Sequence, residues 1–362
     1  MDRRSFLKSS ALGGAGVAAG AALAAPAYAQ GNRTLVMVTS WPRGLAGVHD
    51  AADHVATLIG EMSDGQLTVD LRAAGELVGA FEVFDAVTAG QADMYNAADY
   101  YFTGQHPAYA FFTAVPFGMT SQELMNWYYH MGGQALHDEL GQIFGLKSFL
   151  GGNTGGQPGG WFRSEIQSAA DFQGLRFRMP GLGGEVLAKL GASVQNLPAG
   201  EVYQALASGA IDGTDWVGPW SDQALGFQEI TQIYYTAGFQ EPGAALSVAV
   251  NREVFDSLTP AQQRIIETAS AATHQWSLAQ FMANNGRALE QLRQGGVNTY
   301  DFPDDVWDAF GQASQEVHDE KMGDEIYKRI YDSFMESMRQ SSGWISASDG
   351  VYRAQRDRVL NL

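Results

Sequence analysis

The stretch LRFRMPGLGGEVLAKLGASVQNLPAGEVYQALASGAIDGTDW, residues 175–216, alternates strand-like and helix-like runs. In its first five residues, apolar side chains alternate with Arg176 and Arg178, the pattern of a strand with one buried face. Two helix-like runs follow, each leading into a strand-like run, and the stretch closes on Asp215 and Trp216. Such alternation predicts an α/β fold with a largely parallel sheet, in which ligands bind at the carboxyl ends of strands.

The N-terminal half shows the same alternation. Residues 34–40 and 66–71 have the apolar composition of strands, and residues 48–62 and 76–89 have the periodicity of amphipathic helices. We therefore expect the α/β pattern to extend over most of the chain.

A twelve-residue pattern occurs twice, as EVFDAVTAGQAD at residues 82–93 and as EVYQALASGAID at residues 201–212. Each copy predicts a helix that ends at a glycine cap and leads into a strand. Any helix–glycine–strand unit needs such residues, so the echo is either a local coincidence or the trace of two similar α/β lobes.

A long helix is predicted in the C-terminal part of the chain. Thr259-Pro260-Ala261-Gln262 is a capping box with proline at the first helical position. The helical spacing continues to about Gln294, which gives a rod of roughly 50 Å. One rod of that length can back two lobes.

Two more helices are expected at residues 304–322 and 324–340, before a polar tail that begins near Gly343. The second helix carries apolar residues on more than one stripe between Ile326 and Met338. It packs either against its own chain or against a second subunit.

Residues 1–29 have the features of an export signal. RRSFLK at residues 3–8 precedes a mildly apolar run of alanine and glycine, and Ala27-Tyr28-Ala29 is a cleavage site of the Ala-x-Ala type. The basic start resembles the twin-arginine signal, which is read by the exporter of folded proteins. An ordinary secretory signal with two chance arginines is the alternative, and either signal predicts a periplasmic protein.

Composition excludes several classes of function. With 40 acidic and 22 basic residues the formal charge is −18, whereas nucleic acids and anionic membranes bind basic surfaces. The chain has no cysteine, which excludes disulfides, thiolate metal sites, a cysteine nucleophile and c-type haem attachment. After the signal no apolar run approaches the length of a membrane span, so we expect a soluble protein.

The common signatures of nucleotide binding and catalysis are absent from the sequence. The glycine-rich residues 151–160 do not lead into Gly-Lys-Ser/Thr, and residues 181–186 have Val186 where a dinucleotide fingerprint needs glycine. The seven histidines show no metal-ligand spacing, and no Gly-x-Ser-x-Gly occurs. We therefore expect no catalytic residue, and a periplasmic enzyme is the alternative to a binding protein.

Arg178 is the best candidate for a ligand-binding cation. Pro180 and Gly181 end its strand directly after it, so Arg178 lies nearer the carboxyl end than Arg176, for which a surface ion pair is the simpler interpretation. A guanidinium can hold a carboxylate through two parallel hydrogen bonds.

Other polar side chains share this position at the end of a predicted strand. They follow the strands expected at 147–151, 211–216 and 234–240, and they are Gln157, Asp215 with Trp216, and Glu241. Spacing in the sequence does not show whether they converge.

From the signal through Glu241, the chain resembles the solute-binding proteins of tripartite ATP-independent periplasmic (TRAP) transporters. The motifs that carry this resemblance are GLRFRMPG at residues 174–181, LPAGEVYQAL at 197–206 and GAIDG at 209–213. The branch that binds 2-oxo and 2-hydroxy acids is more similar than the sialic-acid branch, on the evidence of the long C-terminal helices, GNTGGQPGGWF at 152–162 and TDWVGP at 214–219.

The resemblance implies a Venus-flytrap fold like that of periplasmic binding proteins, in which two α/β lobes close over an organic acid. The implied division is lobe I from residues 32–152 and about 243–258, lobe II from 153–242, a long helix and crossover strand from 259–302, and C-terminal helices from 303–362.

The resemblance also implies the site. Arg178 would hold the carboxylate of a small 2-oxo or 2-hydroxy monocarboxylate such as pyruvate, 2-oxobutyrate or lactate, with Gln157 and Trp216 completing the contacts. Asp215 and Glu241, with the Trp216 carbonyl and Gln157, would hold a bridging metal ion. Two carboxylates repel an anionic ligand unless a cation lies between them, and oxygen ligands suit Na⁺ or Ca²⁺. The branch favours Na⁺ and the two acids favour Ca²⁺, so both ions stay open.

Four further residues are candidates for the pocket wall: Tyr100, Tyr101, Asn153 and Phe117. Core packing explains aromatic residues at such positions equally well. The family resemblance further implies membrane subunits that receive the ligand, and the branch implies a homodimer that exchanges C-terminal helices. A receptor that feeds a sensor protein is the other expectation for the partner.

Overall fold

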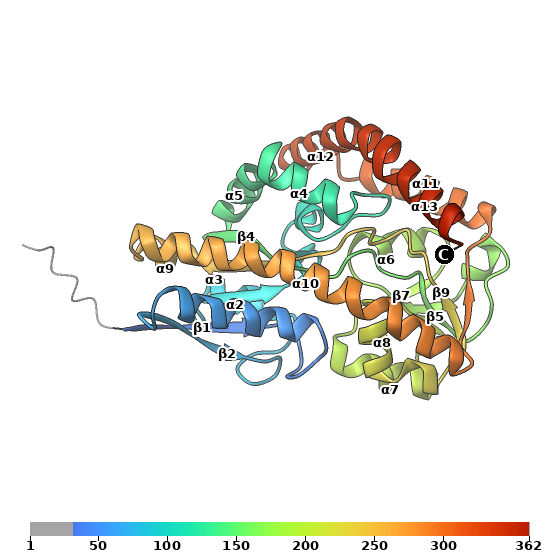
Figure 1. Cartoon of the computed structure of the whole chain (residues 1–362), viewed down its shortest axis with the longest axis horizontal. Coiled ribbons are helices and arrows are strands. Elements are labelled where there is room, and N and C mark those ends of the chain that lie inside the picture. Colours follow the sequence, from blue (N-terminus) through green and yellow to red (C-terminus); the bar gives the residue numbers. More distant parts are fainter. Residues whose placement is uncertain (1–31, 362) are drawn as a thin grey trace, which may run out of the picture.

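The apolar runs predicted as strands pair into two separate sheets, and these divide the protein into two lobes (Figure 1). The computed structural model describes residues 32–361, so the predicted export signal at residues 1–29 lies outside the described residues. Lobe I is built on five strands in the spatial order β2 (Leu67–Arg72), β1 (Arg33–Thr39), β3 (Met94–Ala97), β10 (Ala245–Asn251) and β4 (Leu146–Asn153). Lobe II is built on six strands in the order β11 (Asn298–Tyr300), β9 (Ile233–Tyr235), β5 (Gly160–Phe162), β8 (Gly213–Thr214), β6 (Arg176–Arg178) and β7 (Ser193–Gln195).

Helices connect and cover these strands. In lobe I they are α2 (Val48–Met62), α3 (Val83–Thr88), α4 (Ser121–His130), α5 (Gly133–Ile143) and α9 (Arg252–Asp256), with short 3-10 turns η1 (Asp99–Phe102) and η2 (Pro107–Phe112). In lobe II they are α6 (Gly181–Lys189), α7 (Ala199–Ser208) and α8 (Pro219–Leu225), with 3-10 turns η3 (Ala169–Phe172) and η4 (Phe227–Glu229). Helix α2 is amphipathic as predicted: Val48, Ala52, Val55 and Ile59 lie on one buried face at helical spacing.

The two sheets share one topology. The order β2-β1-β3-β10-β4 in lobe I corresponds to β7-β6-β8-β5-β9 in lobe II, with the same parallel and antiparallel pairs at every step. The repeated sequence pattern falls at equivalent places, because α3 leads into β3 and α7 leads into β8. The glycines that end the two helices, Gly90 and Gly209, have φ of 73° and 74°. The echo therefore marks two similar lobes.

Each sheet is largely parallel as predicted, with one reversed strand that the sequence did not indicate. β10 in lobe I and β5 in lobe II run antiparallel to both of their neighbours. Each of these strands enters its sheet directly from the other lobe, so its direction is set by the crossover and not by a helical connection of the βαβ type.

Two crossovers join the lobes, from β4 to β5 and from β9 to β10, and they pair with each other. The N–H of Thr154 donates to the carbonyl of Ala244 at 2.9 Å, and the N–H of Gln157 donates to the carbonyl of Glu241 at 2.9 Å. The glycine-rich segment on the first crossover permits close packing, since a Cβ at Gly156 would lie 3.2 Å from the carbonyl oxygen of Pro242 on the second crossover. Its glycines therefore serve the junction of the lobes.

Helix α10 (Pro260–Gln294) has the predicted bounds and contacts both lobes. It packs on α2 and β4 of lobe I and on α8 of lobe II, and Figure 1 shows it in orange crossing both. Its Phe281 ring occupies the space that a Cβ on Gly47 would need, and it lies edge-on to Trp220 with ring centroids 5.5 Å apart. The helix is thus a common support for the two halves.

The C-terminal helices are α11 (Asp304–Asp319), α12 (Glu325–Ile345) and α13 (Val351–Leu360), with a π turn (Ser346–Gly350) between the last two. The polar tail expected from Gly343 is instead helical, because helical dihedral angles continue through Gly350 without a break. Helix α12 packs on η2, α4 and α5 of its own chain, and its Tyr327, Ile330 and Phe334 are buried. None of the helices within residues 32–361 is both long and apolar enough to span a membrane.

The predicted helix at residues 76–89 is much shorter in the structure. Only Val83–Thr88 is helical, because residues 73–82 form turns around Gly75, whose φ is 84°. The Glu76 carboxylate, which the prediction placed on the helix, accepts from the Ala73 N–H at 3.1 Å and pairs with Arg43.

Candidate functional site

Arg178 is the last residue of β6, and only 2% of its side chain is exposed. Its Nη1 donates to Oδ1 of Asp215 at 2.6 Å, and its Nε donates to the Leu197 carbonyl at 3.0 Å. Nη2 has no hydrogen-bond partner among residues 32–361. Burial lowers the pKa of Arg178, but the Asp215 carboxylate outweighs burial and raises it above its ordinary value. The side chain is a fixed buried cation with one N–H group to spare.

Asp215 follows β8, which runs parallel to β6, so the two residues lie side by side at neighbouring strand ends. The Asp215 N–H donates to the Arg178 carbonyl at 3.1 Å, which fixes the backbone. Burial raises the pKa of Asp215 to about 6 in spite of the ion pair with Arg178. Its second oxygen, Oδ2, accepts no hydrogen bond from the described part of the chain.

Glu241 and Gln157 lie on the paired crossovers, with 3% and 6% of their surface exposed. The Nε2 of Gln157 donates to the Thr154 hydroxyl at 3.1 Å. Within the described residues Oε2 of Glu241 has no hydrogen-bond donor. Burial, together with the nearby Asp215, raises the pKa of Glu241 well above its ordinary value. Two carboxyl groups this close favour either a shared proton or a bound cation.

Trp216 is held by the loop that follows it. Its Nε1 donates to the Ser221 hydroxyl at 3.1 Å, and the Arg178 guanidinium lies 5.0 Å from its ring centroid. Asp222 lies on α8 and is fully buried. Burial raises its pKa to about 7. It accepts four hydrogen bonds, from the N–H groups of Val217 and Gly218, Nε1 of Trp161 and the hydroxyl of Tyr234.

A small cavity lies where the lobes meet. Its lining from lobe II and the crossovers is Thr154, Gln157, Arg178, Trp216 and Val217, and its lining from lobe I is Trp41, Val48, Tyr100, Tyr101 and Leu246. The lobes touch at its edge, since a Cβ on Gly181 (φ 61°) would lie 3.0 Å from the Tyr100 Cβ. The cavity is charged on the side of lobe II and largely apolar on the side of lobe I.

The structure brings most of the predicted site residues together. Gln157, Arg178, Trp216, Tyr100 and Tyr101 line the cavity. Asp215 lies behind this lining through its ion pair with Arg178, and Glu241 lies behind it close to the Tyr100 hydroxyl.

Phe117 and Asn153 lie outside this cavity, contrary to their candidacy for the pocket wall. Phe117 lines a separate pocket next to α11 and α12, where its ring faces Trp307 at 6.0 Å. Asn153 is fully buried and structural, because its Oδ1 accepts from the Ser121 hydroxyl and from the Gly155 N–H. Arg176 forms the expected surface ion pair, with Asp212.

Three residues on the apolar side of the cavity were not predicted from the sequence: Trp41, Val48 and Leu246. Trp41 follows β1 at its carboxyl end, so the rule that selected Arg178 would also have selected it. Val48 and Leu246 carry no such signal, because buried aliphatic residues at element ends look the same whether they face a core or a ligand.

The donor set fits a hard cation. Asp215 and Glu241 each present a buried oxygen without a partner in residues 32–361. Trp216, whose backbone carbonyl is the third candidate, follows Asp215 directly, and the N–H of Gln157 donates to the Glu241 carbonyl. The described residues contain no cluster of three or more His, Cys, Asp or Glu side chains suited to a metal. Such a site would depend on backbone and amide oxygens beside two carboxylates, as Na⁺ and Ca²⁺ allow and zinc does not.

Two α/β lobes joined by paired crossovers, with one small charged cavity between them, define a binding protein of the Venus-flytrap class. Residues 39–325 match the family model of DctP, the bacterial extracellular solute-binding protein family 7, and the chain belongs to this family. The family comprises the periplasmic substrate-binding receptors of TRAP transporters and not enzymes.

Three relatives illustrate the similarity. A monocarboxylate 2-oxoacid-binding periplasmic protein of Nostoc is 39% identical over 317 residues, which cover 87% of each chain. A TRAP transporter solute-binding protein of Bordetella bronchiseptica superposes with a TM-score of 0.90 at 32% identity, over 91% of this chain and 99% of that one. Its crystal structure is a mixed-occupancy dimer, with copurified calcium and picolinate in a bound active site versus an apo site. A TRAP periplasmic solute-binding protein of Pseudoalteromonas atlantica, with bound sodium and pyruvate, superposes with a TM-score of 0.87 at 38% identity, over 89% of this chain and 99% of that one.

Proposed function

We propose that this protein captures a small 2-oxo or 2-hydroxy monocarboxylate, of the size of pyruvate, 2-oxobutyrate or lactate, and delivers it to TRAP membrane subunits. The observation that carries the proposal is the set of three buried polar atoms without partners among residues 32–361: Nη2 of Arg178, Oδ2 of Asp215 and Oε2 of Glu241. One donor and two acceptors beside a single small cavity suit an anionic ligand and a cation together.

Arg178 would hold the ligand carboxylate, and the Gln157 and Trp216 side chains would complete its contacts. Fixation of Arg178 by Asp215 and by the Leu197 carbonyl supports this role, because a preorganised guanidinium loses little freedom on binding. The lining from lobe I carries no charged side chain to pair with a second carboxylate, which favours monocarboxylates.

A cation would bridge protein and ligand through Asp215, Glu241, the Trp216 carbonyl and Gln157. Its positive charge would favour the ionised forms of both carboxyl groups, whose pKa values burial raises. Relatives hold sodium with pyruvate in one case and calcium with picolinate in another, and we propose Na⁺ with Ca²⁺ as the alternative.

The division of the chain into lobe I (32–152 and about 243–258), lobe II (153–242), backing elements (259–302) and C-terminal helices (303–362) is part of the proposal. It agrees with the strand membership of the two sheets, which meet at the crossovers. Export by the twin-arginine route and a membrane transporter as partner, in preference to a sensor protein, complete it.

A homodimer through the C-terminal helices is supported by a group of exposed apolar residues there. The run from Ile326 to Met338 is covered by its own chain, so it does not require a partner. Beyond it, Trp344 is 75% exposed, and Val351, Tyr352, Val359 and Leu360 are all more than half exposed. Light scattering on the whole protein and on a chain ending at Gly343 should give a dimer and a monomer.

Isothermal titration calorimetry with pyruvate, 2-oxobutyrate and lactate tests the ligand class. We expect binding of at least one of these acids, weakened in chelator-treated, sodium-free buffer and restored by Na⁺ or Ca²⁺. Mass spectrometry of the same mixtures should recover each acid unchanged. Turnover to a new product would reject the receptor, and equal affinity without any cation would reject the bridge.

A further inference from the structure

Beneath the aromatic side of the cavity lies a buried polar cluster centred on Asp99. Asp99 is the first residue of η1, and the next two residues, Tyr100 and Tyr101, line the cavity. Asp99 is fully buried, as are His137 on α5 and Ser247 on β10.

The Asp99 carboxylate is held from three elements of lobe I. His137 Nε2 lies 3.0 Å from its Oδ2, the Ser247 hydroxyl donates to the same oxygen at 2.6 Å, and the Tyr95 hydroxyl donates to Oδ1 at 3.3 Å. The Asp99 N–H donates to the Thr113 hydroxyl at 2.7 Å. Every polar group at the start of η1 is therefore fixed by a different part of the lobe.

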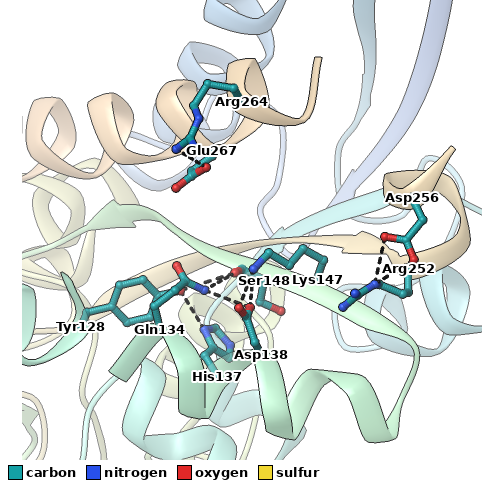
Figure 2. Close-up of polar contacts among 10 residues, drawn as sticks. All are labelled: Tyr128, Gln134, His137, Asp138, Lys147, Ser148, Arg252, Asp256, Arg264 and Glu267. Atoms are coloured by element: carbon teal, nitrogen blue, oxygen red, sulfur yellow. Dashed lines mark hydrogen bonds and ion pairs between the residues drawn. The ribbon is translucent and has the colours of Figure 1, made fainter. Parts of the chain in front are cut away.

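His137 is itself contacted on one ring face and at its second nitrogen. Its ring stacks on Phe112 with centroids 3.9 Å apart and planes 5° apart. Its Nδ1 is 3.1 Å from the Tyr128 hydroxyl, and the same hydroxyl lies 3.4 Å from the Ser148 carbonyl (Figure 2). From Ser148 the contacts continue through Gln134 and Asp138 to Lys147 at the surface.

The cluster also connects the wall to the crossover that carries Glu241. Ser247 follows Leu246 on β10, and Leu246 lines the cavity. β10 begins four residues after Glu241, so the Ser247–Asp99 hydrogen bond ties the position of Tyr100 and Tyr101 to the strand leaving the cation-binding crossover.

We propose that Asp99 and His137 are positioning residues that set the place of Tyr100 and Tyr101 and thereby the ligand size that the cavity accepts. They touch neither the cavity nor the proposed ligand. A buried charged or polar pair of this kind is weak evidence for stability as such, since apolar residues of equal volume often pack as well, whereas it specifies a single geometry. The inference rests on the proposed function, because it assigns the size selectivity of the same site.

The test compares affinities for pyruvate, 2-oxobutyrate and 2-oxovalerate by calorimetry in wild type, Asp99→Ala, His137→Ala and His137→Gln. Misplacing a wall by about 1 Å can change binding of a fitted group by an order of magnitude or more. We expect the preference for the best acid over the others to fall about tenfold in both alanine variants. His137→Gln keeps an N–H that can reach Asp99 and should restore the preference to within about threefold.

The matched control is a second buried histidine–tyrosine pair. His318 Nδ1 lies 2.7 Å from the Tyr327 hydroxyl between α11 and α12, away from the cavity. Tyr327→Phe should lower the melting temperature and leave the ratio of affinities unchanged. An unchanged ratio in folded Asp99→Ala and His137→Ala would overturn the inference.

Hydrogen exchange in the ligand-free protein separates this inference from the proposed function. Tyr128→Phe removes one contact of His137 and is the variant least disruptive to folding. We expect faster amide exchange in residues 99–102 of Tyr128→Phe and no change there in Tyr327→Phe. If wild type binds none of the three acids, this comparison still decides whether the cluster holds η1, and equal exchange in both variants rejects it.

Discussion

The two lobes share one strand order but supply opposite chemistry to the cavity. Lobe II places Arg178 and Asp215 at the ends of β6 and β8, whereas the equivalent strands of lobe I, β1 and β3, end in Thr39 and Ala97. Lobe I contributes aromatic and aliphatic side chains to the same cavity. The shared backbone places equivalent strand ends near the cavity, and the residues there make the lobe II side charged and the lobe I side apolar.

The comparison is tested most severely by Arg178→Lys. A lysine keeps the charge but loses the planar fork, and Asp215 would compete for its single ammonium group. We expect affinity for the best 2-oxo acid to fall by about 1,000-fold, or roughly 4 kcal/mol, in calorimetry. Arg176→Lys, on the same strand but paired with Asp212 at the surface, is the matched control and should leave affinity within about twofold. Equal effects of the two substitutions would remove Arg178 from the site.

Glu241→Gln tests the cation proposed for the charged side of the cavity. The substitution removes a negative charge and one oxygen donor from the crossover, so the cation should bind far more weakly. We expect affinity in saturating Na⁺ or Ca²⁺ to fall about 100-fold and to lose most of its dependence on the ion. Glu229→Gln, at the surface of lobe II, provides the control. A variant that keeps the full cation dependence would contradict the assignment of Glu241.

Asp222→Asn tests how Asp222 supports the loop of lobe II that contains Val217 and Gly218. Because burial raises the pKa of Asp222 to about 7, the folded protein binds its proton more tightly than the unfolded chain does. This group therefore stabilises the fold below about pH 4 and loses that contribution as the pH rises through 7. Asparagine cannot titrate, so the unfolding free energy of the variant relative to wild type should increase by at least about 2 kcal/mol between pH 4 and pH 7. Urea titrations at several pH values measure this difference, and a constant difference would contradict a neutral Asp222 at low pH.

The smallest effect is expected on the apolar side. Val48→Ala removes two methyl groups from the cavity wall, which should weaken pyruvate binding about threefold and improve the relative affinity for 2-oxovalerate. Val55 lies on the buried face of the same helix α2 but away from the cavity. Val55→Ala should lower the melting temperature by a similar amount without changing the relative affinities. If both variants shift selectivity alike, the wall assigned to lobe I is wrong.

The sequence predicted the charged half of the site better than the apolar half, and the reason is physical. Arg178, Asp215 and Trp216 occupy strand ends, which alternation and Pro or Gly stops reveal. Val48 and Leu246 look like core residues until the lobes are placed against each other. Glu241 and Gln157 were also predicted, although β9 and β4 end several residues before them, because the crossovers bring residues to the junction of the lobes.

The fold was predictable where patterns are local. The bounds of α2 and α10 agree with the structure, since a capping box and regular apolar spacing define them. The helix predicted at residues 76–89 was too long because the apolar residues at 77–81, which look like part of a helix, lie in turns that begin around Gly75. Sheet direction depends on which lobe a strand enters, and no local pattern encodes that.

The pairing of Gln157 N–H with the Glu241 carbonyl has a mechanical consequence. Residues on these crossovers lie close to any axis about which the lobes rotate, and atoms move in proportion to their distance from that axis. Helix α10 is about 50 Å long, so a shift of about 1 Å at the crossovers corresponds to several times that distance at its ends. Under the proposed function, a movement of atomic size at the ion and the ligand carboxylate would become a larger change in outline at the ends of α10.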